Sequence, residues 1–383
     1  MASTSHIEIA KDALKDNVNF VKSIVDKKTI ISAVIKGNAY GHGVHIIVPT
    51  LEEFGINHFS VYSSPEAKNA FQFICKKSTI MIMGFVYEND LEWIIENKIE
   101  FFVSTLDMLN KSIEIAKSIK HKVIIHIDIE TGMNRTGFSL KELKKVIGII
   151  NENKRHLIIR GISSHFAGAE SIANYTRIKK QISVFKNRVK LLNENNIDAK
   201  IKHIASSAAT ISYPETQLDL IRTGILIYGY WPTKETFIQY LQRKKSKSDP
   251  LKRALQWKTQ VVLTKEIPAG EFIGYGMSFQ AQHKMKIMLI PVGYCNGYSR
   301  SLSNNGHVIV HGHFASIIGS VNMNMIICDI TNFENVEIGD EVVLIGKQNE
   351  NEISFTSFAE MNNSLNYEIL ARLPINIDRN IVE

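Results

Sequence analysis

The sequence has few cysteines, and their positions limit what the protein can be. Cys75, Cys295 and Cys328 are widely spaced, so they form neither a disulfide framework nor a metal-binding motif. No apolar stretch reaches the roughly 18 residues that a membrane span requires. The N-terminus lacks a basic segment followed by an apolar core, so no secretory signal is predicted. We expect a cytoplasmic protein with no metal site and no membrane partner.

A nucleic-acid partner is not expected either, although the formal net charge is +7. The densest basic run is Arg243-Lys244-Lys245-Ser246-Lys247, and no aromatic residue interrupts it. This run matches no nucleic-acid-binding module and is typical of a solvated linker. An excess of basic residues can also help to attract anionic small molecules.

The first two-thirds of the chain alternates short apolar runs with longer helical patterns. The predicted strands are 30–35, 58–62, 80–85, 100–104, 123–129, 157–165, 199–205 and 218–222. Helices are predicted between them, for example at 65–73, 140–152 and 171–193. Eight strand-then-helix units in this length favour a (β/α)8 barrel. An open doubly wound sheet is the alternative, but no Gly-x-Gly-x-x-Gly follows the first strand.

The pattern changes after the basic linker, which predicts an α/β protein in two parts. Residues 1–245 would form the barrel, and residues 246–383 a mostly β C-terminal domain. In the second part, strands are predicted at 256–265, 285–290, 308–310, 315–321, 325–330 and 341–345. Turn-forming residues separate several of them. One late helix is expected at 355–371, with Ser354 as its cap.

One lysine ends the first predicted strand of the barrel. The apolar run Thr29–Ile35 is rich in β-branched residues and reads as a buried strand. Lys36 follows it, and Tyr40 lies in the glycine-rich loop after it. An amine at the edge of an apolar wall loses hydration, which makes its neutral, nucleophilic form accessible. A lysine that forms a Schiff base needs this property.

Four further strand ends carry residues suited to chemistry, and in a barrel they meet at one mouth. The residues are Asp128 and Arg135 around the loop after strand five, His165 after strand six, Ser206 and Ser207 after strand seven, and Arg222 after strand eight.

The loops after strands seven and eight also suit a phosphate group. The hydroxyl of Ser207 and the amides near Gly224 and Ile225 are the candidate ligands. A reactive lysine together with a phosphate site points to pyridoxal phosphate. A Schiff-base aldolase acting on a sugar phosphate is the rival interpretation from the same residues.

The order of the motifs resembles that of the pyridoxal-phosphate-dependent alanine racemases over nearly the whole chain. The barrel motifs are the loop around Lys36, 131–135, 164–167, 203–209 and 222–229. The C-terminal motifs are Gly274-Tyr-Gly276, 291–300, 319–324 and Asn366-Tyr-Glu368. The resemblance implies an isomerase that interconverts L- and D-alanine and supplies D-alanine for peptidoglycan.

The resemblance implies two catalytic bases. Lys36 would attach the cofactor and act as one base. Tyr275 would be the opposite base, reaching the barrel mouth from a second subunit, so the enzyme would be a homodimer with shared active sites. His165 would hydrogen-bond to Tyr275. Two bases are needed because racemisation removes the α-proton from one face and returns a proton to the other.

The resemblance also implies the binding residues. The phosphate would be held by Tyr40, Ser207, Gly224, Ile225 and Tyr367. Arg222 would face the pyridine nitrogen, and His203 belongs to the supporting motif beside it. Arg135 would reach the ring hydroxyl and the substrate carboxylate, which the backbone of Met323 would also contact. Tyr294 and Arg300 would line the access channel.

Several positions depart from the family pattern. Many relatives carry a carbamylated lysine at the position of Asp128, where it braces the arginine. Here we expect the carboxylate of Asp128 to brace Arg135 itself, directly or through water, with no carbamylated lysine. Asn296 and Asn324 replace the usual aspartates. Ser206 replaces an asparagine, and Thr223 replaces a proline.

Three alternatives to a dedicated alanine racemase stay open, and one of them is a related decarboxylase with the same fold, whose β-domain motifs would differ. A broader amino-acid racemase acting on serine or lysine would use the same two bases. A non-catalytic pyridoxal-phosphate carrier would share only the barrel, and Tyr275 counts against it because such carriers lack the β domain. The position of Tyr367, which would crowd the substrate side chain, favours a small substrate.

Overall fold

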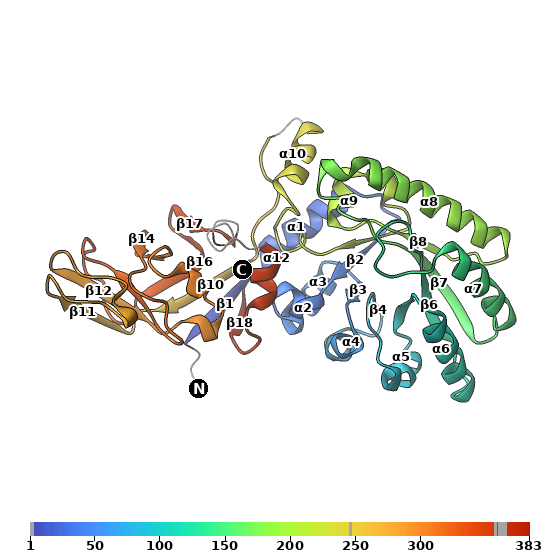
Figure 1. Cartoon of the computed structure of the whole chain (residues 1–383), viewed down its shortest axis with the longest axis horizontal. Helices are drawn as coiled ribbons and strands as arrows, with labels where there is room; N and C mark the ends of the chain where they lie inside the picture. Colours follow the sequence, from blue (N-terminus) through green and yellow to red (C-terminus); the bar gives the residue numbers. More distant parts are fainter. Residues whose placement is uncertain (1–3, 245–246, 356–357, 359–365) are drawn as a thin grey trace. The chain divides into compact units, whose positions relative to one another are not determined.

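The computed structural model describes residues 4–244, 247–355, 358 and 366–383. The chain divides into two compact units (Figure 1). One unit comprises Asp12–Lys36 and Ile47–Arg253, and we call it the barrel unit. The other comprises Met1–Lys11, Gly37–Ile46 and Ala254–Glu383, and we call it the β unit.

The barrel unit contains the predicted parallel sheet. Eight strands are hydrogen-bonded in the order β8-β7-β6-β5-β4-β3-β2-β9. Two hydrogen bonds link the ends of this sheet next to β8 and β9. The amide of Asp219 donates to the carbonyl of Lys202, and the amide of Arg222 donates to the carbonyl of Ala205. These bonds nearly close the barrel. The strands are β2 (Ile30–Val34), β3 (His58–Val61), β4 (Thr79–Ile82), β5 (Glu100–Val103), β6 (Val123–Asp128), β7 (Leu157–Ser163), β8 (Ile201–His203) and β9 (Leu220–Thr223). All eight predicted strands are confirmed.

Helices connect the strands, as a parallel sheet requires. They are α1 (Lys11–Ser23), α3 (Val44–Glu53), α4 (Ser64–Phe71), α5 (Leu91–Glu96), α6 (Leu106–Ser118), α7 (Leu140–Glu152), α8 (Tyr175–Glu194), α9 (Ser207–Ser212) and α10 (Lys234–Gln242). The predicted helix 140–152 coincides with α7, because Ser139 and Glu142 form a capping box at its start. No helix among the described residues is long and apolar enough to cross a membrane.

The β unit contains two sheets. The larger follows the order β14-β13-β16-β10-β1-β18, with β17 paired to β16, and the smaller follows β11-β12-β15. The strands are β1 (Ser5–Ala10), β10 (Leu255–Gln260), β11 (Leu263–Ile267), β12 (Met285–Ile290), β13 (His307–Val310), β14 (His313–Ser316), β15 (Ile326–Asp329), β16 (Glu341–Gln348), β17 (Asn351–Ile353) and β18 (Asp378–Val382).

The predicted single strand at 256–265 is wrong, since the chain turns a corner between the two sheets. The amide of Val261 bonds the carbonyl of Asp340, whereas the amide of Val262 bonds Leu289 in β12. Adjacent residues therefore belong to different sheets, and the strand divides into β10 and β11. The predicted late helix at 355–371 lies largely outside the described residues, which show α12 at Asn366–Arg372.

The N-terminal strand belongs to the β unit, so the assignment of residues 1–245 to the barrel does not account for β1. This strand pairs antiparallel with β10 and parallel with β18. Ile7 and Ile9 are fully buried and alternate with more exposed neighbours. That two-residue period places one face of β1 in the core of the β unit.

Removing apolar volume from β1 should therefore destabilise the β unit. Ile7 is opposite Trp257 in the sheet and is completely buried. We expect I7A to lower the free energy of unfolding by about 2–5 kcal/mol, because it removes buried methyl groups and leaves a cavity. The control is H6A on the opposite face of the strand, which should change stability by no more than about 0.5 kcal/mol. Urea unfolding followed by tryptophan fluorescence measures both, and equal effects of the two variants would contradict the assignment.

Candidate active site

Lys36 lies at the C-terminal mouth of the barrel, directly after β2. The amide of the preceding Ile35 bonds the carbonyl of Ser60, which continues the pairing of β2 with β3. The side chain of Lys36 is open to solvent at the mouth. The protein around the amine nevertheless lowers its pKa by desolvation, and the charge of Arg135 lowers it further, while Glu66 acts in the opposite direction. The amine is therefore both accessible and biased toward its neutral, nucleophilic form.

The backbone after Lys36 makes a left-handed turn. Gly37 to Tyr40 have φ angles between 52° and 61°. Each non-glycine residue in this conformation costs about 1–2 kcal/mol. The turn is held by bonds from the amide of Gly41 to the carbonyl of Gly37 and from the amide of Val44 to the side chain of Asn38. Strain of this kind is found where a fold must fix a functional residue.

His42 secures the same turn from within the β unit. Its Nδ1 donates to the carbonyls of Tyr40 at 2.8 Å and Ala39 at 3.1 Å. The ring is completely buried. Burial lowers the pKa of His42 to about 4, so the imidazole is neutral at neutral pH.

The structure brings together two of the predicted phosphate ligands, Tyr40 and Tyr367, within the β unit. Their ring centroids are 6.0 Å apart. Gly41 beside them has no room for a side chain, since a Cβ there would lie 2.1 Å from the carbonyl oxygen of Leu370. The Nε of Arg379 donates to the carbonyl of Gly41 at 2.7 Å. The loop after Lys36 is thus tied to the C-terminal segment of the chain.

Ser207 and Gly224, two of the predicted phosphate ligands, meet in the barrel unit. The amide of Gly224 donates to Oγ of Ser207 at 3.0 Å, and Thr223 lies 3.2 Å from the same oxygen. Ile225 follows and is buried. Since Thr223 in β9 pairs with Ala33 in β2, this site adjoins the strand that carries Lys36.

Arg222 is a buried cation between β8 and β9. Its Nη1 donates to Nδ1 of His203, and its Nη2 donates to the carbonyl of Ser164 at 2.7 Å. Burial lowers the pKa of Arg222 to about 10, an effect that the charge of Asp128 partly offsets. The guanidinium therefore remains charged at neutral pH and acts as a donor only.

His165 lies beside Arg222 with its ring only partly buried. Its Nδ1 accepts a weak hydrogen bond from Nη2 of Arg222 at 3.4 Å. Burial lowers the pKa of His165 to about 3, and the charges of Arg222, Arg135 and Lys36 contribute. The imidazole is therefore neutral, and its proton resides on Nε2.

Asp128 does not form the predicted direct pair with Arg135. Its carboxylate accepts from Thr136 at 2.9 Å and from Ser163 at 3.4 Å, and no ion pair joins it to Arg135 among the described residues. Burial raises the pKa of Asp128, while these hydroxyls and the charges of Arg222 and Arg135 act against the increase. The aspartate side chain is short and finds nearer partners, whereas Arg135 lies on the exposed part of the loop.

Four predicted site residues gather on neighbouring loops of the β unit. Tyr275 is 76% exposed and Met323 55% exposed. Ser320 donates to the carbonyl of Tyr275, and the amides of Tyr294 and Cys295 bond the carbonyls of Asn322 and Met323. Arg300 joins through Ser303, whose Oγ donates to its carbonyl and accepts from the amide of Val321. The structure therefore connects Tyr275, Tyr294, Arg300 and Met323 in one exposed cluster.

Sequence reasoning missed three buried polar residues below the mouth: His58, Glu100 and His126. His126 links His203 to Glu100 by two hydrogen bonds of 2.9 Å. The sequence does contain a sign of these residues. Glu100 opens the apolar run Glu-Phe-Phe-Val, and His126 lies inside Val-Ile-Ile-His-Ile. Polar side chains are costly to bury without partners, so their place in buried strands predicts a polar network.

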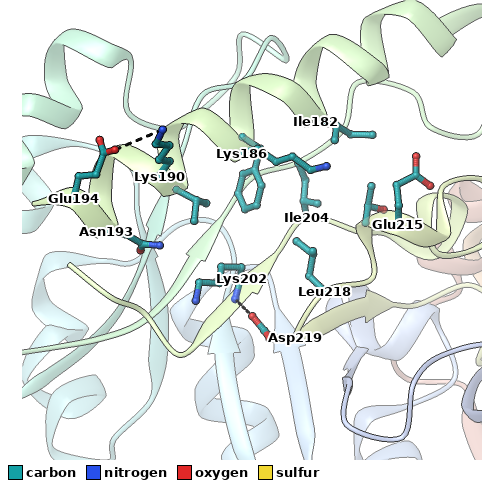
Figure 2. Close-up of a pocket in the computed structure, with 13 residues that line it drawn as sticks. Ile182, Lys186, Lys190, Asn193, Glu194, Lys202, Ile204, Glu215, Leu218 and Asp219 are labelled. Carbon is teal, nitrogen blue, oxygen red and sulfur yellow. Dashed lines mark hydrogen bonds and ion pairs between the residues drawn. The ribbon is translucent and has the colours of Figure 1, made fainter. Parts of the chain in front are cut away.

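A separate cavity of about 600 Å³ is lined by α8, by Lys202 of β8 and by the segment 215–219 before β9 (Figure 2). Ile182, Ile204 and Leu218 contribute aliphatic surface to it. Lys190, at its edge, pairs with Glu194 at 3.7 Å. None of the predicted site residues lines this cavity.

The buried state of His42 predicts a pH effect on stability. The unfolded chain binds a proton on His42 below pH 6.5, whereas the folded chain does so only near pH 4. Stability therefore falls as the pH drops through this window. H42Q keeps a donor but does not titrate, so its loss of stability between pH 7 and 4.5 should be smaller by about 2 kcal/mol. H283Q changes an exposed histidine and is the control. Denaturant unfolding at both pH values measures the difference, and identical slopes for wild type and H42Q would refute it.

Comparison with known proteins agrees with this arrangement. Residues 9–232 match the model of the alanine racemase N-terminal domain, and residues 254–381 match that of the C-terminal domain. Alanine racemase 1 of Caldanaerobacter subterraneus subsp. tengcongensis is 35% identical over 98% of this chain and 94% of its own.

Two solved structures are similar over the whole chain. Alanine racemase from Bacillus anthracis with bound L-Ala-P has a TM-score of 0.90 at 28% identity, covering 100% of this chain and 96% of its own. Alanine racemase from Bartonella henselae with covalently bound pyridoxal phosphate has a TM-score of 0.84 at 26% identity, with full coverage of both chains. The likeness extends over both halves of the chain in sequence and in fold, and the chain belongs to the alanine racemase family of isomerases.

Proposed function

We propose that the chain interconverts L-alanine and D-alanine with pyridoxal phosphate as its cofactor. The observation that carries the proposal is the mouth of the barrel unit, where the accessible amine of Lys36 has a lowered pKa. The strand that Lys36 follows adjoins the pair formed by Ser207 and Gly224. The covalently bound pyridoxal phosphate of the Bartonella relative supports the choice of cofactor.

The residues at the mouth fit this group chemically. Lys36 offers an amine for covalent attachment to an aldehyde. The hydroxyl of Ser207 and the amide of Ile225 would offer donors for a phosphate, together with the amide of Gly224, which donates to Ser207 in its absence. Tyr40 and Tyr367, which belong to the β unit, would add further donors. Arg222 offers a permanent cation for the ring nitrogen. When bound, pyridoxal phosphate withdraws electrons from the substrate and so acidifies its α-proton.

Two side chains of the protein would then handle the proton. Lys36 would accept it at Nζ on one face of the substrate, since desolvation favours the neutral amine. Tyr275 would supply a proton from Oη on the other face. Arg222 keeps its own protons at neutral pH, because its pKa stays near 10 even when buried. It would therefore orient the ring without protonating it, which favours return of the proton to carbon over side reactions.

The substrate carboxylate would meet Arg135 and the backbone of Met323. Tyr294 and Arg300 would line the access channel. The L-Ala-P bound by the Bacillus anthracis relative supports a substrate as small as alanine. A broader racemase acting on serine or lysine would use the same two bases, so the identity of the side chain accepted is part of the test.

A homodimer would complete each site. Tyr275, Met277 and Met323 expose large side chains on one cluster of the β unit, which is typical of a surface covered by a partner. In this arrangement the cluster of one subunit would close the barrel mouth of the other. The reaction would occur in the cytoplasm, where the exposed thiols of Cys75 and Cys295 would stay reduced, and would supply D-alanine for peptidoglycan.

Removing the hydroxyl of Tyr275 should abolish racemisation in both directions. We expect Y275F to lower kcat roughly 10²–10⁴-fold from either enantiomer, since one face of the substrate loses its acid–base group. The visible absorbance of the bound cofactor should persist, because Lys36 is intact. Y240F changes a tyrosine of α10 that packs against Phe20 and Trp231, none of them a predicted site residue, and is the control. Unchanged racemase activity of Y275F would refute the role of Tyr275 as a base, whereas a wild-type protein that binds the cofactor without racemising alanine would favour a carrier.

Mixing two inactive variants tests whether the bases come from different subunits. K36A lacks one base and Y275F the other. If each site combines both chains, a mixed dimer contains one intact site, and random exchange of subunits should restore about a quarter of the wild-type activity. Chiral chromatography of alanine after co-refolding measures this. No recovery in verified mixed dimers would place both bases in one chain.

A further inference from the structure

A line of buried polar side chains crosses the barrel unit beneath the mouth. It runs from Glu100, the first residue of β5, through His126 in β6 and His203 in β8 to Arg222 in β9. Nε2 of His126 lies 2.9 Å from Oε2 of Glu100, and Nδ1 of His126 lies 2.9 Å from Nε2 of His203. Nη1 of Arg222 meets Nδ1 of His203. All four residues are at least nine-tenths buried.

Both imidazoles in this line are neutral. Burial lowers the pKa of His126, and the hydrogen bond to Glu100 offsets the effect only in part. Burial and the charge of Arg222 hold the pKa of His203 well below its usual value. Burial would raise the pKa of Glu100, but the hydrogen bond from His126 and the nearby imidazole of His58 outweigh it, so the carboxylate is charged. A neutral imidazole has one donor and one acceptor nitrogen.

The two ends of the line therefore set its direction. Arg222 can only donate, so Nδ1 of His203 must accept and Nε2 must carry the proton. The carboxylate of Glu100 can only accept, so the proton of His126 is on Nε2 and its Nδ1 accepts from His203. Every bond then has one donor and one acceptor. The opposite tautomer of His203 would place an N–H against the N–H of Arg222.

We propose that Glu100 and His126 are positioning residues for the racemase reaction: they fix His203 in the tautomer that holds Arg222 in place. The inference deepens the proposed function, since it rests on the role given there to Arg222. Without the carboxylate, His126 can adopt the tautomer with its proton on Nδ1. That proton would face Nε2 of His203 and favour the opposite tautomer of His203. His203 would then present a donor to Arg222, and the guanidinium would move.

The packing around the line leaves His126 little freedom. Gly161 in β7 gives it room, because a Cβ at that position would lie 2.1 Å from Nδ1 of His126. The rings of His126 and His203 meet at 86° with centroids 4.9 Å apart. Glu100 is itself fixed, by Nε of Arg160 at 3.1 Å and Nε2 of His58 at 3.5 Å. The carboxylate thus holds one end of a rigid line whose other end is Arg222.

The tautomers can be read directly by NMR of ¹⁵N-histidine in the full-length enzyme, with the signals assigned through H126N and H203N. At neutral pH, His126 and His203 should both be neutral with the proton on Nε2. A proton on Nδ1 of His203, or a charged ring at either position, would overturn the inference without any variant of Glu100.

Variants of Glu100 connect the tautomers to the reaction. E100L removes the acceptor and should move the proton of His126 toward Nδ1. The kcat for alanine should fall roughly 10–100-fold in both directions, as expected when a supporting residue lets a reacting group shift, with a smaller change in KM. E100Q keeps an acceptor oxygen and should retain the wild-type tautomers and most of the activity.

The matched control is S32A, which removes the partner of His58 at 2.8 Å within the same buried cluster but leaves the line intact. It should change neither the tautomers nor kcat by more than about twofold. If E100L does not fold, G161A replaces it, because the added Cβ displaces His126. If E100L or G161A retains the wild-type kcat, this inference is refuted and the proposed function is not. A wild-type protein with the expected tautomers that does not racemise alanine would instead refute the proposed function.

Discussion

The site depends on the desolvation of charged groups at one end of a nearly closed parallel barrel. Eight parallel strands bring their C-terminal ends to one mouth, and three cations lie there: Lys36, Arg135 and Arg222. Desolvation and, after it, the charge of Arg135 lower the pKa of Lys36, and desolvation together with the three cations lowers the pKa of His165. The carboxylate of Asp128 is itself desolvated and, in the described part of the chain, forms no ion pair with Arg135. The mouth therefore carries excess positive charge, which suits a phosphate and an amino-acid carboxylate.

The rigid parts of the fold serve this charge pattern. The left-handed turn after Lys36 fixes the backbone from which the side chain of Lys36 extends. The line from Glu100 to His203 fixes the position of the guanidinium of Arg222. In both cases a buried histidine with a set tautomer holds the geometry, His42 in the turn and His203 in the line. Neutral imidazoles suit this task because each offers one donor and one acceptor without adding charge.

The features of the fold that could be predicted from the sequence are those that a local residue pattern determines. The eight barrel strands were visible as apolar runs, and the candidate residues of the barrel mouth were visible because they lie at or soon after the ends of such runs. Tyr275 ends no such run and was predicted only from the resemblance. The corner at Val261 and Val262 was not visible, because two valines read as a continuous strand whichever sheets their amides join. The roles of Glu100 and His126 were hidden for a related reason. Their partners lie on other strands, and only closure of the barrel brings them within hydrogen-bonding distance.

The central claim is that two groups on opposite faces of alanine carry out proton removal and return. The most direct measurement follows L-alanine in D₂O with the wild-type enzyme, by chiral separation and proton NMR of the product. The account predicts conversion toward an equal mixture of enantiomers, with the newly formed D-alanine carrying solvent deuterium at Cα. D-alanine that retains the original α-hydrogen would show that one base serves both faces, and would contradict the account.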